Sequence, residues 1–140
     1  MLFRSDLEIS ENNCEDISVL SSLTNLTELM MSQNKITDIS AIGNLTKLDC
    51  LYMGHNEISD ISSLSRLTGL TLLWVEDNNI SDISVLPDLK ALTDLNLGYN
   101  KIKDIRVLAG FQKLDTLKLR GNPIEDYSPI EDLEVEHLYK

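Results

Sequence analysis

The 140-residue sequence has no apolar run that approaches the roughly 20 residues needed to cross a bilayer as a helix. It also lacks a recognisable secretion signal, because residues 1–6 are too short a stretch and become charged too early. We therefore expect no membrane insertion. These absences favour the cytoplasm, and they favour the cell surface only if the chain is a segment excised from a larger protein.

Basic residues are scarce as well. The chain has 12 Lys and Arg against 23 Asp and Glu, so its formal net charge is −11. Nucleic-acid sites need clustered cations to neutralise phosphates, and anionic membrane surfaces attract basic segments. The charge balance argues against both as partners.

What the sequence does contain is one unit that recurs with a period of 22 residues. The unit reads Leu-x-x-Leu-x-x-Leu-x-hydrophobic-x-x-Asn-x-Ile-x-Asp-Ile-x-x-Leu, and residues 23–132 hold five regular copies. A fixed period of this length is the signature of a stacked repeat protein. The asparagine of the unit, with a weaker first copy included, recurs at Asn12, Asn34, Asn56, Asn78, Asn100 and Asn122. The aspartate recurs at Asp38, Asp60, Asp82, Asp104 and Asp126.

Each unit divides into a short strand and a turn. Apolar residues such as Leu51 and Met53 alternate with more polar ones, and this period of two indicates a strand with one buried face. The asparagine that ends each strand can bond the backbone of neighbouring coils, which would satisfy its buried amide. The aspartate suits the N-cap of a helical or 3₁₀ turn. About a dozen residues return the chain to the next strand, too few for a full helix with its connections.

These features predict an α/β solenoid of six repeats in a single domain, residues 1–140. Its parallel sheet lies on the concave face and short 3₁₀ or irregular turns lie on the convex face. Residues 1–22 form a degenerate first or capping repeat, in which Met1 and Arg4 stand where later copies have leucine. Residues 133–140 form a C-terminal capping tail. The alternative for the N-terminus is an open edge, in an excised domain or in one that self-associates.

The unit resembles the 22-residue class of leucine-rich repeats, which bacterial internalins share with the regulatory-subunit family of the type-1 protein phosphatase. The run Asn-x-Ile-x-Asp-Ile is closer to the bacterial style, and it begins at Asn34, Asn56, Asn78 and Asn100. Internalins tend to carry proline two residues after the last position of that run, and here only Pro129 matches. The resemblance implies a leucine-rich repeat fold over nearly the whole chain.

The register also predicts which side chains face outward, because residues that flank a buried strand position point to the opposite face. Met30, Tyr52 and Trp74 then stand side by side in three consecutive repeats. A solvent-facing apolar cluster with a charged rim usually marks a contact site, and Tyr and Trp are enriched at binding hot spots. The alternative is that these large side chains shield one another without a partner. The candidate partner-binding residues are Met30, Tyr52, Trp74, Leu72, Cys50, Glu28, His55, Glu76, Asp77 and Tyr99.

Catalytic and metal chemistry has little support in the sequence. The aspartates are spaced one per repeat, so they do not converge on a metal ion, and no phosphate-binding glycine loop or nucleophile motif occurs. Cys50 and His55 lie roughly 15 Å apart along an extended strand, beyond hydrogen-bond reach. Cys14 and Cys50 are two repeats apart, on the order of 10 Å, too far for a disulfide. We expect no enzyme, no cofactor, no metal site and two unbonded thiols.

The leading hypothesis is therefore a non-enzymatic module that binds a partner protein through its concave face, with Trp74 and Tyr52 as anchors. A second hypothesis is a structural spacer or presenting domain within a larger, possibly internalin-like surface protein. A third, which rests on the family resemblance alone, is a regulatory subunit of a phosphatase or another enzyme. Besides a partner on the concave face, a second copy of the chain could pair with the poorly capped N-terminal edge.

Overall fold

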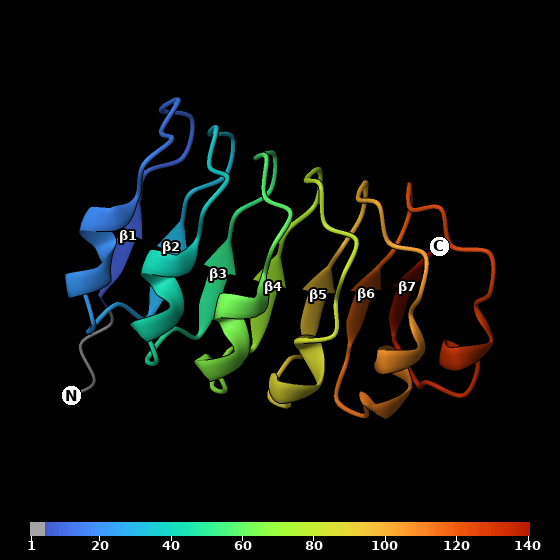
Figure 1. The fold of residues 1–140 in the computed structure, drawn as a ribbon. Helices are drawn as coiled ribbons and strands as arrows, with labels where there is room; N and C mark the ends of the chain where they lie inside the picture. Colours follow the sequence, from blue (N-terminus) through green and yellow to red (C-terminus); the bar gives the residue numbers. More distant parts are fainter. Residues whose placement is uncertain (1–4) are drawn as a thin grey trace.

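A computed structural model describes residues 5–140, which wind into a single row of coils (Figure 1). Seven short strands lie side by side in chain order, and every neighbouring pair is parallel. The strands are β1 (Asp6–Glu8), β2 (Glu28–Met30), β3 (Cys50–Tyr52), β4 (Leu72–Trp74), β5 (Asp94–Asn96), β6 (Thr116–Lys118) and β7 (His137–Tyr139). The prediction of a solenoid with one parallel sheet is confirmed.

Short 3₁₀ turns line the side of the coils opposite the sheet, one turn to each coil (Figure 1). They are η1 (Ser18–Ser22), η2 (Ser40–Asn44), η3 (Ser62–Arg66), η4 (Leu86–Asp88), η5 (Arg106–Gly110) and η6 (Ser128–Ile130). The described residues contain no α-helix, because the return segment of each coil is too short for one. No helix in residues 5–140 has the length and apolar character to cross a membrane.

The core runs along the axis of the solenoid as one continuous apolar column. The middle residue of each inner strand points into it, and Leu29, Leu51, Leu73, Leu95 and Leu117 are all 0% exposed. Each of these leucines is aligned with its counterpart in the next strand. The 22-residue period therefore places identical side chains in register, so that every coil buries its apolar edge against its two neighbours.

The asparagine column ties consecutive coils together. Asn78 Oδ1 accepts a hydrogen bond from the Ile58 N–H at 2.9 Å, and its Nδ2 donates to the carbonyls of Met53 and Val75 at 3.0 and 3.1 Å. Ile58 and Met53 belong to the preceding coil and Val75 to the same coil. The pattern recurs at Asn34, Asn56, Asn100 and Asn122. In the first coil, Asn12 Nδ2 bonds the carbonyls of Ile9 and Ser10.

The repeated aspartates lie just before the N-caps of the 3₁₀ turns, one residue before in every turn except η4, where Asp82 lies three residues before the N-cap Val85. Asp38 Oδ1 accepts a hydrogen bond from the N–H of Ser40, the first residue of η2, at 2.8 Å, while Ile39 occupies the N-cap position. The carboxylate thus satisfies an amide that has no carbonyl partner within the turn. The same bond, from an aspartate to the amide two residues on, is made by Asp16, Asp60, Asp82, Asp104 and Asp126.

The predicted C-terminal capping tail, residues 133–140, contains a strand. Residues 137–139 form β7, which adds a seventh strand to the sheet beyond the six predicted repeats. The step from β6 to β7 is 21 residues, since Lys118 is aligned with Tyr139, whereas earlier strands are spaced by 22. Leu138 and Tyr139 are 36% and 51% exposed, so this last strand extends the sheet and leaves apolar surface open.

At the opposite end, the weak first repeat folds as a full coil with its own strand and turn, β1 and η1. Asp6 and Glu8 of β1 are exposed and Leu7 packs against the edge of the core. Met1 and Arg4, whose places in the first repeat the sequence suggested, lie outside the described residues.

Candidate functional site

The outward side chains at the end of each strand form a line across the sheet, which we call the concave row. Strand geometry creates it, because successive side chains point to opposite faces, and the fixed period repeats the same outward position in every coil. Its members are Glu8, Met30, Tyr52, Trp74, Asn96, Lys118 and Tyr139, each aligned with the next by strand pairing.

Met30, Tyr52 and Trp74 occupy adjacent places in this row, and all three are half-buried. The rings of Tyr52 and Trp74 meet edge to face, with centroids 5.4 Å apart and an angle of 78° between their planes. This arrangement is a favoured geometry for two aromatic rings. The three predicted residues therefore form one apolar surface that faces away from the core.

Lys118 and Tyr139 extend the row beyond the residues singled out in the sequence. The Lys118 ammonium lies 4.9 Å from the centre of the Trp74 ring and 5.6 Å from that of the Tyr139 ring. Both distances are within the range of a cation–π attraction. Asn96, between Trp74 and Lys118, is 8% exposed, since the side chains of its neighbours lean over it.

A second line of outward residues flanks the concave row at the start of the strands. Glu28, Cys50, Leu72 and Asp94 are all half-buried and are aligned in register. Burial raises the pKa of the Tyr52 phenol, and the nearby acidic groups of Cys50, Glu28 and Asp94 raise it further. The Tyr52 phenol thus lies among acidic groups, whereas the neighbouring Trp74 ring has the Lys118 ammonium against it.

Glu76 lies just past β4 and points back over the preceding coil. A Cβ added at Gly54 would lie 2.6 Å from the Glu76 carboxylate, so the absence of a side chain at Gly54 leaves room for this carboxylate. One of its oxygens, Oε2, and the Trp74 Nε1 are buried and have no hydrogen-bond partner within residues 5–140. Buried polar atoms are nearly always bonded, and two such atoms on one face are unusual.

The remaining predicted residues form the rim beyond the strand ends. His55, Asp77 and Tyr99 occupy equivalent turn positions with φ of 55°, 52° and 54°, a left-handed conformation that is uncommon outside glycine. The Nδ1 of His55 and the Oδ2 of Asp77 are 2.7 Å apart, a hydrogen bond between exposed side chains of neighbouring coils. Tyr99 is 54% exposed and its ring packs over Gly121.

The structure therefore brings the ten predicted residues onto one face in two groups. Met30, Tyr52 and Trp74, with the line of Glu28, Cys50 and Leu72 beside them, form the centre. Glu76, His55, Asp77 and Tyr99 form the rim. Lys118 occupies the same outward position as Trp74 two repeats later, but the 22-residue period does not specify how closely its ammonium approaches the indole. Tyr139 could not be placed, because the last step of the chain is one residue short.

This face has the features of a contact surface. No group of three or more His, Cys, Asp or Glu in residues 5–140 could hold a metal ion. Neither Cys14 nor Cys50 takes part in a disulfide within the described part of the chain. What the row offers is exposed aromatic and apolar area on a sheet whose backbone is fixed by hydrogen bonds.

Comparison with known families agrees with the repeat pattern. The family described as leucine-rich repeats (2 copies) matches residues 6–44, 24–66 and 46–88, and the family described as leucine-rich repeat matches residues 68–124. These matches cover most of the chain, so the protein belongs to the leucine-rich repeat family. Proteins of this family are generally non-enzymatic interaction modules, and no catalytic family matches.

Solved structures point to the internalin type of repeat. An internalin, InlF, from Listeria monocytogenes is 35% identical with a TM-score of 0.82, over 95% of this chain and 46% of that one. Internalin C2 from the same species is 32% identical with a TM-score of 0.79, over 96% of this chain and 69% of that one. A leucine-rich repeat protein from Leptospira interrogans, 22% identical with a TM-score of 0.84, shares the fold over 93% of this chain and 36% of its own.

The chain thus spans less than half the length of the internalin InlF that it matches. A comparison with curated proteins found no match. The fold and the family are therefore known from structure and repeat sequence, while the partner has to be inferred from the chemistry of the surface.

Proposed function

We propose that this protein is a non-enzymatic binding module that holds a partner protein on its concave face. The observation that carries the proposal is the adjacency of Met30, Tyr52 and Trp74, half-buried and facing outward in three consecutive strands. Side chains of this kind bury large area at little entropic cost when a partner covers them. Trp and Tyr accordingly dominate binding hot spots.

The backbone that carries these residues is already ordered. Hydrogen bonds between neighbouring strands and the asparagine bonds between coils hold each outward position at a fixed spacing. A partner that docks on such a surface loses little conformational entropy from this side of the interface. Preorganisation supports a role in binding a folded protein surface.

The charge around the concave row suggests the character of the partner. Glu28, Asp94 and Glu76 lie near Tyr52 and Trp74 and outnumber the one nearby cation, Lys118, and the chain as a whole carries −11. A partner surface with basic residues around an apolar patch would complement it, and complementary charge raises association rates. Binding should therefore weaken as salt is added.

Affinity capture with matched variants tests the proposal. We expect Trp74→Ala to reduce affinity for the captured partner by about 2 kcal/mol or more, roughly 30-fold. The control is Val19→Ala, which removes an apolar side chain that is 76% exposed on the turn side. The control should recover the partner as the wild type does. If Trp74→Ala and Tyr52→Ala both recover as much partner as the wild type does, binding through the concave row is refuted, and a structural spacer becomes the better explanation.

Self-association at the β1 edge is a separate proposal for the same chain. Within residues 5–140, β1 pairs with β2 alone, and its outward Asp6 and Glu8 are exposed. Sedimentation at high salt, where repulsion between carboxylates is screened, is the condition most favourable to pairing. A monomer at every salt and protein concentration would exclude it.

A further inference from the structure

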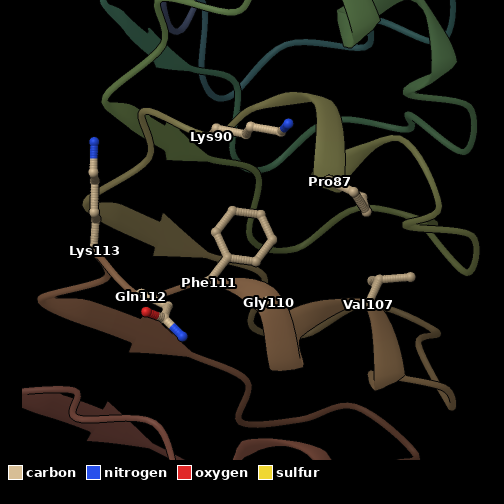
Figure 2. Close-up of a pocket in the computed structure, with 7 residues that line it drawn as sticks. All are labelled: Pro87, Lys90, Val107, Gly110, Phe111, Gln112 and Lys113. Carbon is tan, nitrogen blue, oxygen red and sulfur yellow. The ribbon is translucent and has the colours of Figure 1, made fainter.

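A pocket of about 330 Å³ opens between the turns η4 and η5, on the other side of the coils from the concave row. Figure 2 shows the Phe111 ring at its centre, with Pro87 and Val107 on one side and Lys113 on the other. Its volume lies at the low end of the range for small-ligand sites. The space suits one large side chain better than an extended ligand.

Departures from the repeat pattern create this pocket. η4 has three residues where the turns before it have five, and Pro87 lies in it. Gly110 lacks a side chain, and a Cβ built there would meet no atom within 4 Å. Phe111 takes the place of a leucine, and its ψ of 107° differs from the 61° of Leu89 at the equivalent position. These differences in turn length, side chain and backbone angle coincide with the opening.

Two lysines flank the opening. Within residues 5–140, neither Lys90 nor Lys113 has a hydrogen bond, ion pair or ring contact. Some exposed cations elsewhere do have partners, since Lys47 bonds Asn25 and Arg66 bonds Asn44 across coils, whereas Lys103 has none in the described residues. In a chain with a net charge of −11, the two lysines place positive charge on either side of an apolar floor.

We propose that this pocket is a second docking site, which takes an acidic protein segment that inserts one aromatic or branched apolar side chain. The floor of Pro87, Val107 and Phe111 provides the apolar contact. Lys90 and Lys113 pair with carboxylates on either side of the inserted residue, as charge complementarity requires. The site is independent of the concave row, whose acidic surroundings favour a partner of opposite charge.

Selection from a phage-displayed library of short random peptides tests the proposal without a known ligand. The wild-type protein serves as bait, and the Gly110→Leu variant removes peptides that bind elsewhere. A Cβ at residue 110 meets no atom within 4 Å, so leucine is tolerated at this wall of the pocket, where we expect its bulk to obstruct the opening. We expect enriched peptides with Asp or Glu around one Phe, Trp, Leu or Ile. The probe for all further measurements is the most enriched peptide, made synthetically with a fluorophore.

Three variants define the site by fluorescence anisotropy. Gly110→Leu should weaken peptide binding by about tenfold or more, and the double variant Lys90→Met/Lys113→Met should weaken it similarly while it keeps apolar bulk. Trp74→Ala should bind the peptide as the wild type does, which separates this site from the concave row. Thermal melts confirm that each variant is folded.

Three results would overturn the proposal. The first is that no peptide survives counter-selection against Gly110→Leu. The second is that the enriched peptides are basic or lack a large apolar residue. The third is peptide affinity that the folded lysine double variant leaves unchanged.

Discussion

Asn78 illustrates how single residues hold the coils together. It is 8% exposed and bonds the Ile58 N–H and the carbonyls of Met53 and Val75, three backbone groups from two coils. Replacement of the Asn78 side chain leaves these buried backbone donors and acceptors without a hydrogen-bond partner, and water reaches them poorly. A buried group without a partner costs roughly 1–3 kcal/mol.

Asn78→Ala should therefore lower the free energy of unfolding by about 1–3 kcal/mol or more, as measured by urea denaturation. Asn79→Ala is the matched control, because Asn79 is the next residue and its only hydrogen bond in the described structure is from its backbone N–H to the Ile58 carbonyl. A midpoint for Asn78→Ala as high as that of the control would mean that the asparagine column does not hold the coils.

Leu73 and Leu72 test the register of β4. Leu73 is 0% exposed in the core, whereas Leu72 faces outward and is half-buried. We expect Leu73→Ala to cost ~2–5 kcal/mol in the free energy of unfolding, since it leaves a cavity in the core. Leu72→Ala should cost clearly less in the same thermal and urea melts. The reverse order would place the wrong face of the strand in the core.

At the scale of the element, each turn begins with an aspartate bonded to the amide two residues on. These bonds lower the carboxyl pKa values of Asp38, Asp60 and Asp82, chiefly through the amide of the following serine and then through its hydroxyl. Arg106, through its side chain first, lowers the pKa of Asp104 to about 2. All these groups are exposed, so their effect on stability is a matter of pH and not of burial.

The pH dependence follows from the direction of these shifts. A carboxyl whose pKa is lower in the folded chain stabilises the fold above its unfolded pKa, about 3.9, and this stabilisation is lost as pH falls through the folded value. The melting temperature should therefore fall as pH drops from about 4 toward 2. Asp38→Asn/Asp60→Asn/Asp82→Asn keeps the acceptor and removes the titration, so its melting temperature should fall less steeply. If the melting temperatures of the wild type and the triple variant fall equally steeply with pH, these aspartates do not cause the loss of stability at low pH.

The elements could largely be predicted from the sequence, because the 22-residue period specifies strand, asparagine and turn at once. The exceptions are positions where the chain departs from that period. The sequence predicts a capping tail at residues 133–140, where the chain departs from the repeat. In the structure Leu138 aligns with Leu117 after a step of 21 residues, so residues 137–139 extend the sheet. The pocket beside Phe111 arises from the shape of one turn, and the period does not contain that information.

At the scale of the whole molecule, the stacking of like coils converts a sequence period into a surface. Register alone placed Met30, Tyr52 and Trp74 side by side, and the strand pairing agrees. Register could not predict the contact of Lys118 with the indole or the burial of Asn96, because both depend on side chains that reach across a strand. The sequence of a repeat protein thus predicts which residues face outward, but it predicts less well which of their side chains touch one another.

A bound partner should cover the concave row, and Trp74 reports on this directly because it is the only tryptophan in the chain. The partner recovered by affinity capture would be titrated into the protein, with emission and acrylamide quenching recorded from the indole, after correction for any tryptophan in the partner. We predict that emission shifts to the blue and that quenching falls to a plateau at saturation. Saturating partner that leaves both emission and quenching of Trp74 unchanged would contradict the account.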